Sequence, residues 1–249
     1  MEILSLARSM GRVMVDDLAK HFDVAAQTIR RDLGDLADLG HLDRVHGGAV
    51  PRQGMVNIAY ERRRKLNASG KQAIGAAVAA AIPENSSVIL TLGTTTEAVA
   101  QALLHHRNLT VITNNMNVAN ILGANPGCEI VVTGGALRRS DGGLVGALTA
   151  EFFGQFKVDI AVLGASALDQ DGDLLDYDLA EVRVSRAILA QARTTFVVAD
   201  HMKLTRSAPA RIASLSPVAK LFTDQPLPPE LTRRCTEWGC EVVVAPTLA

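Results

Sequence analysis

The stretch from Gly70 to the end of the chain alternates short apolar segments with segments of helical periodicity. The apolar segments read SVILTL, LTVIT, CEIVVTGG, VDIAVLGAS, TTFVVAD, KLFTD and EVVVA. Strands that are apolar on both faces and separated by helices pair in parallel, because the crossover helices bury both faces of the sheet. The sequence therefore predicts an α/β domain with a mostly parallel sheet over residues 70–249.

The first 52 residues lack such strands and carry segments with apolar residues at helical spacing. These apolar residues are Ile3, Leu4 and Ala7, then Leu18, Ala19 and Phe22, and then Ile29, Leu33, Leu36 and Ala37. The connection FDVAAQ has the length that joins the two helices of a helix-turn-helix, and Val24 is expected to fill the angle between them. HLDRVHGGAV then alternates up to a Gly-Gly turn, as a β-ribbon wing does. Residues 1–52 are thus expected to form a winged helix-turn-helix.

The third helical segment has a polar face opposite its apolar one. If Ile29 and Leu33 face the core, residues at helical spacing on the other side point outward. The outward residues are Gln27, Arg30, Arg31 and Gly34. Gln and Arg can each form two hydrogen bonds with base edges in the major groove, and glycine permits close approach. This face is therefore a candidate DNA-reading surface.

Other residues of this region are candidates for contacts outside the base edges. Thr28 and the first helical amides are expected at phosphate, because a helix N-terminus carries free N–H groups and partial positive charge. Arg44 and His46 on the wing would reach phosphate or the minor groove. Two alternatives stay open: His46 caps its own turn, or the helix arginines pair with neighbouring aspartates on a solvated surface. Those aspartates are Asp32, Asp35 and Asp38.

The net charge of the chain is −1, but residues 1–65 carry +2 and the remainder carries −3. This asymmetry permits double-stranded DNA as a partner of the N-terminal side. One recognition helix reads few bases, so a two-fold oligomer that presents two helices about 34 Å apart is expected.

The cysteines, Cys128, Cys235 and Cys240, are odd in number and lack zinc-ligand spacing, which indicates inert thiols in a reducing compartment. We therefore expect no metal and no cofactor. The apolar run over 73–82 is too short to span a bilayer, and Glu2 and Arg8 interrupt any leader near Met1. A cytoplasmic protein without a membrane partner is expected.

Small polar residues recur at the ends of the first three predicted strands. They are Gly93, Thr94 and Thr95, then Thr113, Asn114 and Asn115, and then Gly134 and Gly135. Ligands of parallel sheets bind at the carboxyl ends of strands, and helix N-termini with small polar residues can bind phosphate without lysine. The three strand ends are therefore predicted to form one phosphate site.

The motifs TIRRDL and RVHGGAV, at their joint spacing, resemble the DeoR family of bacterial transcriptional repressors. The resemblance extends from GKQAIG to LFTD and includes GTTTEAVAQALLHHRNLTVITNNMNVANIL, DGGLVG and LDQDGDLLDYDLAEVRVSRAIL. It implies an effector domain similar in fold to ribose-5-phosphate isomerase. It also implies a dimeric or tetrameric repressor that leaves its operator when a phosphorylated small molecule binds. Glycerol-3-phosphate is the effector expected from it, and another sugar phosphate such as fructose-1-phosphate is the alternative.

The chain departs from the family pattern at three positions. Ala25 stands where a serine usually caps the recognition helix, and the lost cap costs about 1 kcal/mol. Thr91 replaces an aspartate, and Ser185 replaces a lysine, so Glu181 loses an i,i+4 partner. Lys203 matches a family lysine and is expected to keep the cationic role, so these changes bear on the identity of the effector.

Residues 53–69 show no sustained periodicity and contain a basic run, Arg62–Lys65, so a linker is expected there. The basic run would contact the DNA backbone or the acidic second domain, or stay solvated. A family arginine matches Arg63, which leaves a hinge role open for this residue.

An enzymatic alternative would use Asp176, Glu181 or Asp200 as a general base on a sugar phosphate. Such chemistry needs a nearby electrophilic group, and Ser185 stands where a lysine would be required. The acidic run over 171–178 resembles a calcium loop but lacks the closing glutamate, so it is interpreted as a solvated loop. The sequence thus predicts a regulator and not an enzyme.

Overall fold

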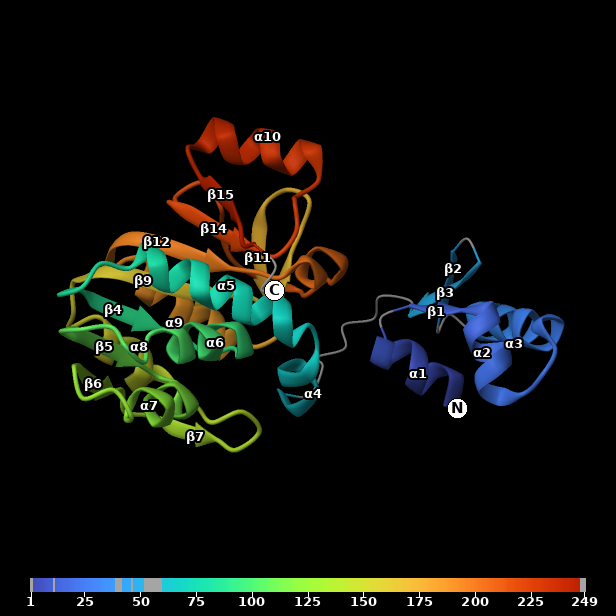
Figure 1. Ribbon diagram of the computed structural model, residues 1–249, viewed down its shortest axis with the longest axis horizontal. Coiled ribbons are helices and arrows are strands. Elements are labelled where there is room, and N and C mark those ends of the chain that lie inside the picture. Colours follow the sequence, from blue (N-terminus) through green and yellow to red (C-terminus); the bar gives the residue numbers. More distant parts are fainter. Residues whose placement is uncertain (1, 11, 39–41, 46, 52–59, 247–249) are drawn as a thin grey trace. The chain divides into compact units, whose positions relative to one another are not determined.

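The computed structural model describes residues 2–10, 12–38, 42–45, 47–51 and 60–246. The chain divides into two compact units, Met1–Val56 and Asn57–Ala249 (Figure 1). No helix among the described residues is long and apolar enough to cross a membrane.

The first unit has the elements of a winged helix-turn-helix. They are α1 (Glu2–Met10), β1 (Val13–Met14), α2 (Val15–Phe22), α3 (Ala26–Asp38), β2 (Leu42–Val45) and β3 (Gly48–Pro51). Its described strands form an antiparallel sheet in the order β1-β3-β2. Leu18, Ile29, Leu33 and Leu42 meet in one core. The predicted helices and wing are therefore present.

The turn between α2 and α3 differs from the expectation for Val24. Asp23 closes α2 in the left-handed conformation, with φ +52°, and its backbone N–H donates to the end of α2. Val24 follows with 40% of its surface exposed, so it does not fill the angle between the helices. The backbone of Asp23 makes the turn, since aspartate tolerates positive φ better than most residues.

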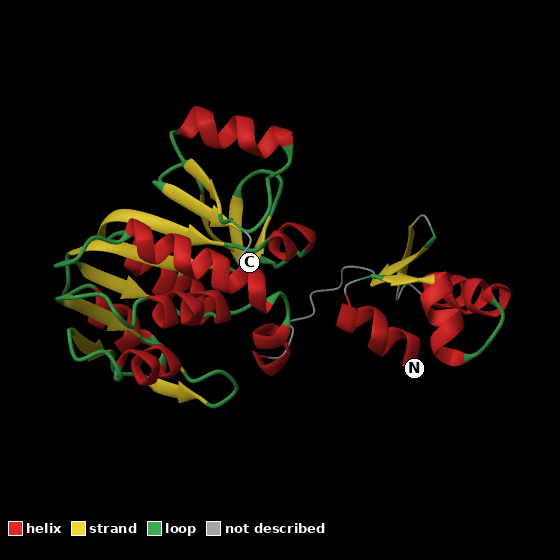
Figure 2. Cartoon of the chain, viewed as in Figure 1, coloured by secondary structure: helices red, strands yellow, loops and turns green. Residues whose placement is uncertain are grey.

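The second unit is built around a parallel sheet (Figure 2). Its elements are α4 (Tyr60–Lys65), α5 (Ala68–Ala81), β4 (Ser87–Leu90), α6 (Thr94–Ala102), β5 (Leu109–Thr113), α7 (Met116–Leu122), β6 (Cys128–Val132), β7 (Ala136–Arg138), β8 (Gly143–Val145), α8 (Ala147–Phe153), β9 (Val158–Gly164), β10 (Ala167–Leu168), β11 (Asp173–Asp176), α9 (Leu179–Leu189), β12 (Ala192–Val198), the 3-10 helix η1 (His201–Thr205), β13 (Ala210–Ser214), β14 (Lys220–Thr223), α10 (Pro229–Trp238) and β15 (Glu241–Val244).

Within the described residues, the main sheet has seven parallel strands in the order β15-β14-β12-β9-β4-β5-β6. Each of them matches one of the predicted apolar segments, so the predicted fold class is confirmed. The chain runs outward from β4 through β5 to β6 and then returns to place β9 on the other side of β4. The order of the strands therefore reverses between β4 and β9, which is where ligands bind in such sheets.

Alternate residues of the central strands pack into different helical layers. Val88 and Leu90 of β4 join the core beneath α5, α6 and α7, whereas Ile89 joins the core beneath α8 and α9. Figure 1 shows α5 and α6 across the near face of the sheet. Two small antiparallel sheets, β10-β11-β13 and β7-β8, were not predicted because their strands are short and only partly apolar.

The expectation of a linker over residues 53–69 needs correction. Residues 60–65 form α4, and α5 begins at Ala68, so these residues belong to the second unit. The helix is too short and too polar to show an apolar period, since none of its residues is buried. Residues 52–59 lie outside the described part of the chain.

Candidate functional site

The exposed side of α3 carries the residues predicted to contact DNA. Gln27, Thr28, Arg30 and Arg31 are exposed, while Ile29 and Leu33 of the same helix are 1% and 2% exposed. Among the described residues, neither arginine forms an ion pair with a neighbouring aspartate, which was the alternative role. As far as the structure describes this unit, this face of α3 thus carries two positive charges without an ion pair.

The wing approaches the same side of α3. Arg44 of β2 is exposed, and its Nη2 lies 4.0 Å from the point where a side chain at Gly34 would begin. A larger residue at position 34 would meet this guanidinium. Ala25 precedes α3, and its carbonyl accepts from the Thr28 N–H at 2.9 Å, but its methyl group cannot cap the remaining amides. His46 lies outside the described residues.

A pocket in the second unit opens at the carboxyl ends of β4, β9 and β12. It is lined by Tyr60, Arg63, Thr91, Leu92, Gly93, Thr94, Thr95, Thr96, Glu97, Asn114, Asp141, Gly164, Ala165, Ser166, Asp176, Glu181, Val184, Ser185, Val198 and Lys203. Among the predicted effector-binding residues, this pocket brings together Gly93, Thr94, Thr95, Asn114, Glu181 and Lys203. Thr91 and Ser185, where the chain departs from the family pattern, also line it.

Four predicted effector-binding residues lie outside this pocket lining. The Thr113 hydroxyl donates to the Leu90 carbonyl at 2.6 Å and so ties β5 to β4. Asn115 caps α7, because its Oδ1 accepts from the Asn117 N–H at 2.9 Å. Both side chains therefore form hydrogen bonds within the protein that fix the end of β5 and the start of α7.

Gly134 and Gly135, the other two, follow β6. This strand is the edge of the sheet, separated from β4 by β5, so its end does not converge with the β4 end. The Thr149 hydroxyl donates to the Gly134 carbonyl at 2.8 Å, and Gly135 has φ +138°. A side chain at Gly135 would overlap Thr149 Oγ1, so this glycine serves the packing against α8.

The N-terminus of α6 faces the pocket without a side-chain cap. Gly93 occupies the N-cap position with φ +141°, and the first helical residues, Thr94 and Thr95, line the pocket. The Thr96 hydroxyl donates internally to the Thr91 carbonyl at 2.8 Å. The first amides of a helix have no intrahelical acceptor, so the pocket contains N–H groups suited to an anion.

Lys203 of η1 places a buried positive charge in the pocket. It is 9% exposed, and in the described part of the chain its ammonium forms no ion pair. Burial lowers the pKa of Lys203 to about 7, and the nearby Arg206, Arg63 and Lys71 lower it further, whereas Asp200 opposes them. An anion placed beside Lys203 would therefore favour its charged form.

Asn114 contributes a fixed hydrogen-bond acceptor. It is 2% exposed, and its Nδ2 donates to the Leu144 carbonyl at 3.1 Å, which sets the orientation of the amide. Its Oδ1 is buried and has no hydrogen-bond partner among the described residues. A buried acceptor without a donor costs about 1–3 kcal/mol, which a ligand hydroxyl would offset.

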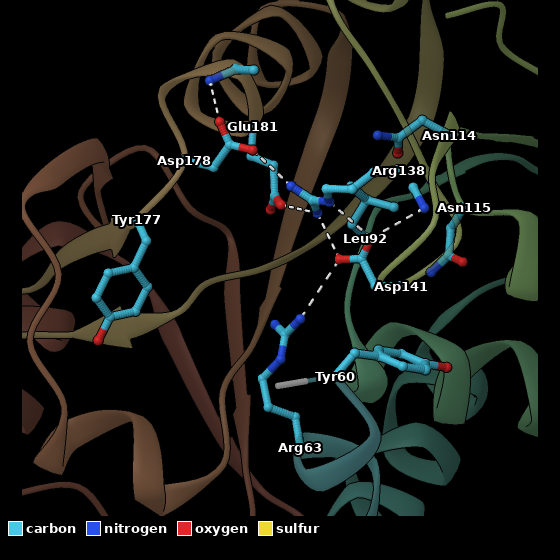
Figure 3. A network of polar contacts seen from close by, with 12 residues as sticks. Tyr60, Arg63, Leu92, Asn114, Asn115, Arg138, Asp141, Tyr177, Asp178 and Glu181 are labelled. Carbon is cyan, nitrogen blue, oxygen red and sulfur yellow. Dashed lines mark hydrogen bonds and ion pairs between the residues drawn. The ribbon is translucent and has the colours of Figure 1, made fainter. Parts of the chain in front are cut away.

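A second pocket shares Tyr60, Arg63, Asp141 and Glu181 with the first and contains a network centred on Arg138 (Figure 3). Its guanidinium donates to Asp141 at 2.9 and 2.6 Å and to Asp178 at 2.7 Å, and it pairs with Glu181. Burial raises the pKa of Glu181 to about 7, with Asp176 adding to the shift and Arg138 opposing it. Arg138 thus provides the partner that Ser185 cannot provide for Glu181.

Sequence reasoning missed Tyr60, Arg138 and Asp141, and it left Arg63 open as a hinge. Tyr60 and Arg63 are three residues apart and so share one face of α4, but the helix itself was not predicted. Arg138 and Asp141 lie in the β7-β8 hairpin, which also escaped prediction. The available signal was the nearness of opposite charges in ALRRSDGG, and such a pattern is too common to identify a site.

The acidic run over 171–178 is not simply solvated, which corrects the earlier interpretation. Arg234 pairs with Asp171 at 3.0 Å, Arg211 with Asp173 at 2.5 Å, and Asp178 belongs to the Arg138 network. Across the described residues, no group of three or more His, Cys, Asp or Glu side chains is placed to hold a metal ion. Asp171, Asp173 and Asp178 are therefore paired with arginines from different elements, and Asp176 accepts from the Ser166 hydroxyl.

The fold and the pocket define a class: a winged helix-turn-helix joined to an α/β unit with a polar pocket at the ends of its strands. Two family models match the chain, the DeoR-like helix-turn-helix domain over residues 1–53 and the DeoR C-terminal sensor domain over residues 66–225. The chain belongs to the DeoR family.

Similar curated proteins cover nearly the whole chain. The glycerol-3-phosphate regulon repressor of Escherichia coli (strain K12) is 41% identical over 235 residues, which is 94% of this chain and 93% of that protein. The protein of the same name from Haemophilus influenzae is 45% identical and covers 89% of this chain and 87% of its own length. The expectations of a DeoR-type transcriptional repressor that is not an enzyme are confirmed by these relatives.

Among solved structures, ribose 5-phosphate isomerase A from Neisseria gonorrhoeae matches 55% of this chain and 53% of its own, at 12% identity and a TM-score of 0.39. A likeness of this size bears on neither activity nor ligand.

Proposed function

We propose that this repressor binds operator DNA through α3 and the wing, and that a phosphorylated polyol in the pocket releases it. Glycerol-3-phosphate is the proposed effector. The observation that carries the proposal is the buried ammonium of Lys203, which has no ion pair within the described residues, in a pocket that also contains the uncapped N-terminus of α6. The relatives named as glycerol-3-phosphate regulon repressors support this choice of effector.

The phosphate is proposed to lie between Lys203, Arg63 and the first amides of α6. A phosphate there would accept hydrogen bonds from Lys203 Nζ and from Arg63 Nε, which is buried without a partner among the described residues. Hydrogen bonds between ionised groups are about twice as strong as neutral ones. Gly93, Thr94 and Thr95 would provide the remaining donors.

The polyol hydroxyls are proposed to lie toward Asn114 and Glu181. A ligand hydroxyl can donate to Asn114 Oδ1, whose amide orientation is already set by Leu144. Glu181 is held by Arg138 at the same pocket. A ligand with phosphate at one end and hydroxyls at the other matches the charges of both ends.

On the DNA side, Gln27, Arg30 and Arg31 are proposed to contact base edges in the major groove. Thr28, Arg44 and His46 are proposed to contact phosphate. The protein is proposed to act in the cytoplasm as a homodimer or tetramer, because two recognition helices about 34 Å apart match two half-sites.

The test is a titration of glycerol-3-phosphate into the full chain bound to a fluorescent operator selected from random DNA by this protein. Release at saturation supports the proposal. Fructose-1-phosphate serves as the comparison ligand. Release of DNA by fructose-1-phosphate but not by glycerol-3-phosphate would overturn the proposed effector. Release by neither ligand would overturn the pocket assignment.

A further inference from the structure

The helix α4 is held to the second unit by polar contacts and not by a buried apolar face. None of the residues of Tyr60–Lys65 is buried. A helix of this length is unstable by itself in water, because it cannot repay the cost of nucleation. Its position therefore depends on the groups that anchor it, and those groups lie at the pocket.

The two ends of α4 are anchored differently. At its start, the Tyr60 hydroxyl donates to Glu97 Oε2 at 2.9 Å and accepts from Asn117 Nδ2 at 3.0 Å. At its end, the buried Lys71 ammonium donates to the carbonyls of Arg63 and Leu66. Both Tyr60 and Glu97 line the pocket. The start of the helix is thus tied directly to the pocket wall.

The contact in the middle of α4 is the weakest of its anchors. Arg63 lies 3.6 Å from Asp141, which is beyond hydrogen-bond distance. Asp141 is already held by two hydrogen bonds from Arg138, and Figure 3 shows both arginines converging on this carboxylate. Because its Nε is also without a partner among the described residues, Arg63 is the group most easily exchanged to another anion.

Two buried lysines repel Arg63, and Asp141 attracts it. Lys203 and Lys71 are both close enough for their positive charges to interact with the Arg63 charge. A phosphate among these groups would replace repulsion by attraction. Two of the α4 anchors, Arg63 and Lys71, belong to this set of cations, so a bound anion acts on both.

We propose that α4 couples the pocket to the DNA-binding unit: a bound phosphate takes Arg63 from Asp141 and shifts the helix. This proposal rests on the proposed effector site and adds its means of regulation. In sequence, α4 directly follows the segment that leads from the DNA-binding unit. A ligand moves an equilibrium only through different contacts in the two states, and the exchange of Arg63 provides that difference. Tyr60 is a positioning residue that fixes the start of α4.

The test uses Tyr60→Phe in the full chain, with Arg64→Ala, an exposed position of the same helix, as the matched control. Glycerol-3-phosphate affinity is measured by calorimetry without DNA, and operator affinity by fluorescence anisotropy with and without glycerol-3-phosphate. In Tyr60→Phe, the ratio of the two operator affinities, the second taken at glycerol-3-phosphate concentrations that saturate that variant, is expected to fall about fivefold or more. Arg64→Ala should keep both wild-type values. A wild-type ratio in Tyr60→Phe would overturn the proposal.

Amide hydrogen exchange of the wild-type chain provides a second measurement. Saturating glycerol-3-phosphate is expected to change exchange over residues 60–66 and to leave α10 unchanged. Unchanged exchange in α4 with the ligand bound would overturn the coupling and leave the effector site standing. If glycerol-3-phosphate does not bind, the effector assignment fails. Exchange is then measured with inorganic phosphate, and unchanged exchange in α4 at saturation overturns the coupling.

Discussion

The cations of α3 and those of the pocket differ in their surroundings. Arg30 and Arg31 are exposed and, among the described residues, form no ion pairs, whereas Arg138 is held by carboxylates and Lys203 is buried. Exposed cations suit a polyanion that brings many phosphates and releases counterions. Buried cations suit one small anion that replaces lost hydration. The two regions therefore use positive charge for different kinds of partner.

The largest expected effect is on stability. Arg138→Met should lower the free energy of unfolding by about 3 kcal/mol, because it leaves partly buried carboxylates without their counterion. Arg30→Met should change it by less than about 0.5 kcal/mol. Urea unfolding followed by circular dichroism, with Trp238 fluorescence for the second unit, measures both. Equal losses in the two variants would contradict the comparison.

Lys203→Met should weaken glycerol-3-phosphate binding about 100-fold, since a buried cation that meets a phosphate has no solvent to replace it. Operator affinity without effector should stay at the wild-type value. Calorimetry and anisotropy measure these quantities, and Lys157→Met, at an exposed lysine of the same unit, is the control. Loss of effector binding in both variants would point to general charge and not to the pocket.

Arg31→Ala should reduce discrimination at one base pair by about 1–3 kcal/mol. Arg44→Ala should weaken binding to all DNA sequences alike and lower the slope of log affinity against log salt concentration by about 1. Anisotropy titrations on the operator, its single-base variants and random DNA separate these outcomes. An unchanged ratio of operator to random DNA in Arg31→Ala would show that α3 presents another face to the bases.

Effector binding in the pocket should depend on pH, whereas DNA binding by the arginines of α3 should not. Burial lowers the pKa of Lys203 to about 7 in the protein alone, and a bound phosphate raises it, so binding takes up a proton. Affinity for glycerol-3-phosphate should therefore fall about tenfold from pH 7 to 8.5. Calorimetry in buffers of different ionisation enthalpy detects the proton, and a flat profile would argue against Lys203.

The smallest effect concerns hydroxyl recognition by Asn114. Asn114→Leu should weaken glycerol-3-phosphate about fivefold and leave propyl phosphate, which lacks hydroxyls, unaffected. Thr133→Val is the matched control, because Thr133 Oγ1 is also buried without a partner among the described residues but lies outside the pocket lining. Equal weakening of both ligands in Asn114→Leu would place the phosphate, and not a hydroxyl, at this residue.

The helices of the first unit and the strands of the main sheet could be predicted because periodicity is local. Ile29 and Leu33 mark the buried side of α3, and the apolar segments mark each strand of the main sheet. Most of the pocket lining was beyond this reasoning. Arg63 and Asp141 are far apart in sequence and lie in short polar elements, so neither carries a period that points to the other.

The sequence by itself determined the division into a winged helix-turn-helix and a parallel α/β unit, because helix and strand periods are properties of neighbouring residues. Only the tertiary structure decided which strand ends share a site. Gly134 and Gly135 follow an edge strand, while the return of the chain places β9 beside β4 and brings Lys203 and Glu181 to Gly93. Strand order depends on contacts between distant segments, and those contacts arise only when the sheet is assembled.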